Sequence, residues 1–149
     1  MSVSILTIGA VGREDMIGIV VVSHGKLARE LVRATEHVVG EQDYFRSISI
    51  EAEDDIDARR EQIRETVAAC NTGKGVIIVT DMFGGTPSNL AISVMPDAKI
   101  EVIAGVNLPM LIKLIEVREH SKLDEAASVG RDAGQKYIRI ASEVMGQTA

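Results

Sequence analysis

Short apolar runs that alternate with longer amphipathic stretches set the strongest limit on how this chain can fold. Residues 17–22 have the sequence IGIVVV, which is apolar and mostly β-branched, so they predict a strand that is covered on both faces. Further strands are predicted over residues 44–50, 76–80 and 99–104. Strands separated by helical stretches predict an α/β fold, with a doubly wound, mainly parallel four-stranded sheet and helices on both faces.

Amphipathic periodicity predicts helices over residues 26–39, 56–69, 86–95, 108–118 and 123–135. In the first helix, four apolar residues recur at helical spacing and should pack on the sheet: Leu27, Leu31, Ala34 and Val38. Thr86 followed by Pro87 predicts an N-cap with proline at the first helical position. The stretch 137–140 (YIRI) alternates in period two, which predicts an edge strand, formed within the domain or in a partner subunit.

The 149 residues fit one domain, which we place at residues 16–141, with an N-terminal extension over 1–15 and a tail over 142–149. The extension lacks the basic start and long apolar stretch of a signal peptide or membrane span, so we interpret it as dispensable. A single cysteine, Cys70, favours a reducing compartment, and we expect the cytoplasm. The net charge of −6 argues against nucleic acid and anionic membranes, so the expected partners are proteins or small molecules.

Two titratable side chains follow predicted strands: His24 after residues 17–22 and Asp81 after residues 76–80. The carboxyl ends of parallel strands form one crevice at the switch point of a doubly wound sheet, so both side chains should face it. A carboxylate that accepts from one imidazole nitrogen fixes the tautomer and leaves the other nitrogen nucleophilic. We therefore predict that His24 is a nucleophile for phosphorus and that Asp81 orients it and stabilises the positive charge that develops on the ring.

The neighbouring residues suit a phosphoryl group. Helix N-termini direct free N–H groups and a positive dipole end at the same crevice. Gly25, Gly84 and Gly85 permit close approach of the backbone to phosphate oxygens, and the hydroxyls of Thr86 and Ser88 are candidate donors to them. The predicted chemistry requires neither a metal nor another cofactor.

Three stretches resemble the IIA domain of the mannose/fructose/sorbose family of the bacterial phosphoenolpyruvate-dependent sugar phosphotransferase system. They are residues 17–25 (IGIVVVSHG), 79–89 (VTDMFGGTPSN) and 102–111 (VIAGVNLPML). The resemblance implies that His24 accepts phosphoryl from the phosphohistidine of the phosphocarrier protein HPr and passes it to a IIB component, which phosphorylates an incoming sugar. It also implies that Asp81 is the hydrogen-bonded partner of His24 and that Thr86 places a hydroxyl near the phosphoryl group.

Further expectations follow from the same resemblance. Phe83 provides an aromatic lip for partner docking, with a place in the core as the alternative. The protein should form a homodimer that exchanges the edge strand 137–140. Because the sequence stops at Ala149, IIB is expected on a separate chain, and any attachment to the inner membrane would run through transporter components.

Two other functions remain open at this stage. One is a regulatory protein whose phosphorylation controls binding to another protein, and the other is the phosphoryl donor subunit of a dihydroxyacetone kinase. The Gly-Gly-Thr-Pro loop fits the mannose type better than the kinase subunit. A response-regulator receiver needs an acidic pair where this chain has Ser23-His24, and nucleotide-binding glycine fingerprints are absent from the sequence. The sugar stays unknown, because its specificity lies in the membrane components.

Overall fold

The structure is a computed structural model, and it describes residues 15–148. The prediction for residues 1–15 therefore lies outside the described residues, apart from Asp15. Four strands form one sheet in the order β2-β1-β3-β4, and all neighbouring pairs are parallel. The strands are β1 (Gly18–His24), β2 (Phe45–Ile50), β3 (Val76–Thr80) and β4 (Ile100–Ala104). The predicted four-stranded parallel sheet is thus confirmed.

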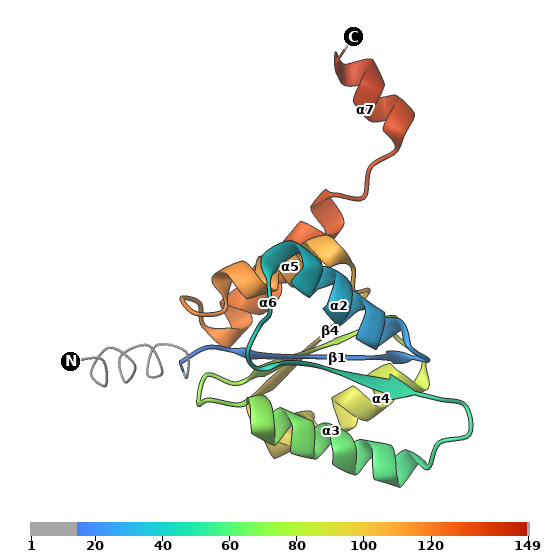
Figure 1. Cartoon of the computed structure of the whole chain (residues 1–149), viewed down its shortest axis with the longest axis vertical. Coiled ribbons are helices and arrows are strands. Elements are labelled where there is room, and N and C mark those ends of the chain that lie inside the picture. The colour runs from blue at the N-terminus through green and yellow to red at the C-terminus, as the bar shows by residue number, and fades with distance from the viewer. Residues whose placement is uncertain (1–14, 149) are drawn as a thin grey trace, which may run out of the picture.

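Helices cover both faces of this sheet, as predicted (Figure 1). One face carries α2 (Leu27–Val39), α5 (Leu108–Val117) and α6 (Leu123–Lys136), and the other carries α3 (Ile56–Cys70) and α4 (Thr86–Ser93). A short 3₁₀ turn, η1 (Met95–Asp97), follows α4, and α7 (Ala141–Thr148) ends the described chain. Within residues 15–148, no helix combines the length and the apolar character that crossing a bilayer would require.

The central strand β1 contributes side chains to two apolar cores, one on each face of the sheet. Ile19 and Val21 pack toward α2, α5 and α6, whereas Val20 and Val22 pack toward α3 and α4. All four side chains are fully buried, which agrees with the prediction of a strand covered on both faces. The connection from β1 leads to β2 on one side, and the connection from β3 leads to β4 on the other, so the switch point lies between β1 and β3.

The buried face of α2 differs from the predicted one. Ala28, Val32 and Thr35 are buried, whereas Leu27 is exposed and Val38 is 60% exposed. Leu31 of the predicted face does pack against the core, but the prediction counted only apolar residues and so left out Thr35. The Thr35 hydroxyl donates to the Leu31 carbonyl oxygen at 2.7 Å, so its polar atom is satisfied inside the fold and the helix turns this narrow face to the sheet.

The C-terminal segment also differs from one of its two predicted arrangements. Residues 138–140 form no strand within the described chain, and α7 follows them, projecting away from the sheet (Figure 1). The side chains of Tyr137, Ile138 and Ile140 are exposed. The edge strand is therefore not formed within the domain, and its exchange with a partner subunit stays a prediction.

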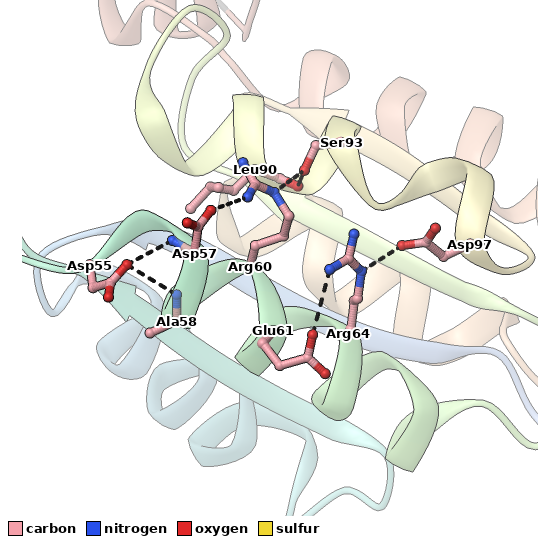
Figure 2. Close-up of polar contacts among 9 residues, drawn as sticks. All are labelled: Asp55, Asp57, Ala58, Arg60, Glu61, Arg64, Leu90, Ser93 and Asp97. Atoms are coloured by element: carbon pink, nitrogen blue, oxygen red, sulfur yellow. Dashed lines mark hydrogen bonds and ion pairs between the residues drawn. The ribbon is translucent and has the colours of Figure 1, made fainter.

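Two arginines of α3 connect this helix to the end of α4 and to η1 (Figure 2). Arg60 Nε donates to Ser93 Oγ at 3.2 Å, and Arg64 Nε lies 2.7 Å from Asp97 Oδ2. These contacts lie at the surface, where water and salt weaken ion pairs. The position of α4, and of the loop that precedes it, is therefore set mainly by the buried apolar face of the helix.

Candidate functional site

His24 and Asp81 are in contact at the carboxyl ends of β1 and β3. Nδ1 of His24 lies 2.8 Å from Oδ2 of Asp81, and the backbone N–H of His24 donates to the same oxygen at 3.0 Å. The other carboxylate oxygen, Oδ1, accepts from the backbone N–H of Met82 at 3.0 Å. Both oxygens of Asp81 therefore serve as acceptors, and the carboxylate is held in one orientation.

This contact assigns the tautomer of the neutral imidazole. A carboxylate oxygen only accepts, so Nδ1 of His24 carries the ring proton and Nε2 keeps its lone pair. The side chain of His24 is 52% exposed, whereas that of Asp81 is 13% exposed. Asp81 is thus largely covered, whereas about half of the His24 side chain is open to another molecule.

The pKa of Asp81 lies below its ordinary value. Burial acts in the opposite direction, because it disfavours the charged carboxylate, but the hydrogen bonds from the backbone and ring of His24 outweigh it. Asp81 is therefore a carboxylate at neutral pH. It is ready to stabilise positive charge on the imidazole ring.

Gly85 lies against the His24 ring. A Cβ atom at this position would be 2.6 Å from Cε1 and 3.0 Å from Nε2 of His24, so any side chain would displace the ring. The preceding Gly84 has φ +87°, a left-handed conformation that glycine adopts without strain. The two glycines therefore shape the loop around the imidazole. Gly25 has a separate function in the turn after β1, where its N–H donates to the Ile50 carbonyl oxygen at 2.9 Å.

Thr86 and Ser88 occupy different positions relative to the surface. Gly85 is the N-cap of α4, because its carbonyl accepts the helical hydrogen bond from Asn89 N–H at 3.1 Å. Thr86 is therefore the first helical residue, and not the N-cap that we predicted, and it is exposed. Ser88 is fully buried, and its hydroxyl donates to the Gly85 carbonyl oxygen at 3.0 Å. The geometry favours Thr86 over Ser88 as a donor to a bound group.

Three apolar side chains close in sequence to His24 and Asp81 are exposed. Phe83 is 63% exposed, which excludes the alternative that it belongs to the core. Met82, which follows Asp81, and Leu27, three residues after His24, are also exposed. The sequence analysis placed Leu27 on the face that packs on the sheet and gave Met82 no function, although both follow a site residue within three positions. We call Leu27, Met82 and Phe83 the apolar rim.

Metal-ligating side chains do not gather in one place in the part of the chain that the structure describes. Within residues 15–148, no group of three or more histidine, cysteine, aspartate or glutamate side chains has the arrangement needed to hold a metal ion.

Known proteins resemble this chain in sequence. The family model described as "PTS system fructose IIA component" matches residues 18–129. The mannose-specific EIIAB component of Escherichia coli K12 is 31% identical over 125 residues, which cover 83% of this chain but only 39% of that protein. The sorbose-specific EIIA component of Lacticaseibacillus casei is 31% identical over 130 residues, covering 85% of this chain and 92% of the relative. The second match therefore extends over nearly the whole relative.

A solved structure has the same fold. The phosphotransferase system component EIIA from Streptococcus agalactiae superposes with a TM-score of 0.79 and is 26% identical, covering 86% of this chain and 99% of that chain. Sequence and fold agree, and the matched range includes both His24 and Asp81. The chain therefore belongs to the mannose/fructose/sorbose family of phosphotransferase system IIA components.

Proposed function

We propose that this protein is a phosphoryl carrier of the sugar phosphotransferase system and that Nε2 of His24 carries the phosphoryl group. The observation that carries the proposal is the 2.8 Å contact between His24 Nδ1 and Asp81 Oδ2 in a ring that remains half exposed. Because the carboxylate keeps the proton on Nδ1, the lone pair of Nε2 is available at the surface, where another protein can reach it.

The first transfer needs only a donor phosphohistidine, which the family relationship leads us to assign to HPr. The lone pair of His24 Nε2 attacks phosphorus, and a new N–P bond forms as the donor's N–P bond breaks. The electron pair of the broken bond returns to the donor ring nitrogen. His24 keeps its Nδ1 proton and becomes positively charged, and Asp81, 2.8 Å away, stabilises this charge.

The second transfer reverses the roles of His24. A nucleophile of a IIB component on a separate chain attacks the phosphorus, and the electron pair of the N–P bond returns to His24 Nε2. No group of the sugar has to contact this protein, since IIB would phosphorylate the sugar during uptake. The proposed cycle takes place in the cytoplasm, with the membrane reached only through transporter components.

The start of α4 is proposed to hold the phosphoryl oxygens. The first N–H groups of a helix have no partner within the helix, and its dipole favours negative charge there. The exposed Thr86 adds a hydroxyl at this end, and Gly85 keeps the backbone close to the ring. Ser88 acts indirectly in this proposal, because its hydroxyl already holds the Gly85 carbonyl.

The apolar rim of Leu27, Met82 and Phe83 is proposed to dock both protein partners. Its three side chains are exposed and lie within three residues of His24 or Asp81. Exposed aromatic and methionine side chains are enriched in protein interfaces. One rim next to the reactive nitrogen suits a carrier that must bind its donor and its acceptor in turn.

We also propose that the protein is a homodimer in which the segment 137–140 of one copy pairs with β4 of the other. Two observations support this: β4 is an edge strand, and a groove of about 460 Å³ runs along it, lined by Phe83, Val102, Ala104 and Gln135 among others. The exposed apolar side chains of the segment would then be covered.

Intact-mass measurement tests the carrier function. The protein is incubated with phosphoenolpyruvate, enzyme I and HPr, and the mass is recorded before and after mild acid treatment. We expect one acid-labile phosphoryl group on the wild type and none on His24→Ala. His37→Ala is the matched control, because His37 is also exposed but lies on the outer side of α2.

Two results would contradict the proposal. Labelling that persists in His24→Ala would move the phosphoryl group to another residue, and a wild type that gains no mass would exclude the carrier function with this donor. If labelling occurs, addition of a purified IIB component should remove the label. Retention of the label with each IIB encoded in the same genome would favour the regulatory alternative.

A further inference from the structure

The stretch 102–111, which carries part of the family resemblance, forms a connection between the candidate site and α6. It includes the end of β4, the turn Gly105–Val106, and Asn107, which is the N-cap of α5. None of these residues takes part in the proposed phosphoryl transfer. The turn that precedes Asn107 nevertheless contacts the residue before Asp81, and Asn107 itself contacts α6.

The first link of the connection joins the turn to β3. The backbone N–H groups of Gly105 and Val106 both donate to the carbonyl oxygen of Thr80, at 3.0 and 3.1 Å. Thr80 is the last residue of β3 and immediately precedes Asp81. A shift of the turn would therefore move the peptide group from which the carboxylate extends toward His24.

The second link is the side chain of Asn107, which uses both ends of its amide. Oδ1 accepts from the Met110 N–H at 3.0 Å and so caps α5, while Nδ2 donates to the Gly134 carbonyl oxygen on α6 at 2.9 Å. The two partners fix which end is oxygen, because a backbone N–H only donates and a carbonyl only accepts. Among the common N-cap residues, asparagine alone has both the acceptor and a donor of sufficient reach.

The packing around Gly134 makes this link tight. A Cβ atom on Gly134 would be 3.0 Å from Met110 Cε and 3.3 Å from Asn107 Oδ1, so a side chain there would push α6 away from the cap. Gly134 is buried and belongs to the last turns of α6. The turn after β4 is therefore clamped between the end of β3 and a helix that packs beside it.

We propose that Asn107 is a positioning residue, which holds Asp81 in register with His24 by clamping the turn Gly105–Val106 between Thr80 and α6. The inference rests on the proposed phosphoryl transfer for its kinetic consequence, but its structural consequence is independent of that function. Loss of the Asn107–Gly134 bond frees the turn, lengthens the contact between Asp81 and His24, and leaves the apolar rim in place.

Asn107→Ser is the variant that tests this inference. Serine keeps the capping acceptor for Met110 but is too short to reach Gly134, and it adds no charge near Asp81. Asn71→Ser is the matched control: the Asn71 side chain accepts from the Gly73 and Gly75 N–H groups at the opposite end of the sheet. Asn107→Asp, which retains the length and the cap but lacks the donor, serves as a second variant if the serine variant does not fold.

Three measurements follow, and two of them require no phosphoryl donor. In Asn107→Ser, hydrogen exchange of the Gly105 and Val106 amides should accelerate, and the pKa of Asp81, followed by carboxyl NMR, should rise toward its ordinary value. The rate of phosphoryl acceptance at saturating HPr should fall about 10- to 100-fold, with the half-saturating HPr concentration unchanged. Asn71→Ser should match the wild type in all three.

The outcomes separate this inference from the proposed function. Unchanged Asp81 titration and unchanged amide exchange in Asn107→Ser would overturn the positioning inference, whatever the protein does with phosphoryl donors. A rise in the half-saturating HPr concentration without a fall in the saturated rate would also overturn it, since that result places Asn107 in docking. If the wild type accepts no phosphoryl group, the proposed function fails, and the first two measurements still decide the inference.

Discussion

The two ends of the sheet each hold a charged side chain, and they hold it differently. At the amino end, Arg118 is 2% exposed and donates to three oxygens of the segment 42–44, at 2.7 to 3.3 Å. At the carboxyl end, Asp81 accepts backbone and ring hydrogen bonds, but the ring partner, His24, is half exposed. The charge of Arg118 is buried within the fold, whereas the charge of Asp81 lies beside a histidine that is half exposed.

This difference distinguishes a structural polar cluster from the proposed phosphoryl-transfer site. Desolvation lowers the pKa of Arg118, and the three oxygens that accept its hydrogen bonds compensate for the buried charge. At the other end, the hydrogen bonds that hold Asp81 leave Nε2 of His24 unused. The proposed phosphoryl transfer uses this nitrogen.

Replacing Asp81 by asparagine should have the largest effect on phosphoryl acceptance, because it removes the carboxylate that contacts the half-exposed His24 ring. Both carboxylate oxygens accept hydrogen bonds, whereas the amide of asparagine has one oxygen, so either the ring or the Met82 N–H faces a donor. We expect phosphoryl acceptance to slow by up to about 10⁴-fold, as occurs when a triad aspartate becomes asparagine. Rapid-quench kinetics with phosphorylated HPr measure the rate.

The control for this variant is Asp132→Asn on the exposed surface of α6, which should accept phosphoryl at the wild-type rate. Nitrogen NMR of the His24 ring should show that the proton has left Nδ1 in Asp81→Asn. A variant that keeps both the tautomer and the rate would mean that the carboxylate does not orient the histidine.

Gly85→Ala should have the next largest effect, and it disturbs the same end of the sheet by steric means alone. The new methyl group would lie 2.6 Å from His24 Cε1, so the ring must rotate out of line with Asp81. We expect a loss of about 100-fold in the rate of phosphoryl acceptance, with little loss of stability because the ring can move into solvent. Gly146→Ala, where a Cβ atom would meet open space, is the control. A wild-type rate in Gly85→Ala would show that the ring does not need its observed position.

Arg118→Met tests the amino end of the sheet and should change the stability of the fold but not the rate of phosphoryl transfer. The methionine keeps the apolar stem but removes the donor from the Asp43 carbonyl oxygen and from Gln42 Oε1, whereas the Tyr44 carbonyl oxygen keeps the Ile19 N–H. The free energy of unfolding should fall by about 1–3 kcal/mol, measured by urea titration, while the rate of phosphoryl acceptance stays unchanged. Arg29→Met, at an exposed position on α2, should change neither quantity. A slower transfer in Arg118→Met would mean that the two ends are coupled.

The sequence predicted the sheet well because its signals are local. A run such as residues 17–22 can satisfy its side chains only if both faces are covered, and glycine turns mark the strand ends. The face of α2 was predicted wrongly, because the pattern cannot reveal that the Thr35 hydroxyl finds the Leu31 carbonyl. A count of apolar positions does not identify a polar residue that can be buried because a nearby carbonyl accepts its hydrogen bond.

The contact between the two residues of the candidate site was predictable, whereas the burial of the residues around them was less so. Strand ends in a parallel sheet meet at one edge, so the contact of His24 with Asp81 follows from topology. The burial of Ser88 and the exposure of Leu27 depend on how each helix is rotated about its axis. An error of one residue changes that rotation by about 100°, which is enough to exchange a buried position for an exposed one. The link from Asn107 to Gly134 spans 27 residues, and no spacing rule predicts it.

The smallest expected effect is a dependence of the unfolding free energy on pH. It tests whether the ionised Asp81 carboxylate also contributes modestly to the stability of the fold. Burial raises the pKa of Asp81, but hydrogen bonds from His24 lower it by more, so the folded-state pKa lies below the unfolded one of about 3.9. A depressed carboxyl pKa stabilises the fold above the unfolded pKa, and this stabilisation disappears as the pH falls through the folded pKa. The difference in unfolding free energy between wild type and Asp81→Asn should therefore be greatest near neutral pH and shrink below about pH 4. Urea titrations at several pH values measure this difference. A difference that stays constant down to pH 3 would mean that the ionised carboxylate adds nothing to the stability of the fold at the carboxyl end of the sheet.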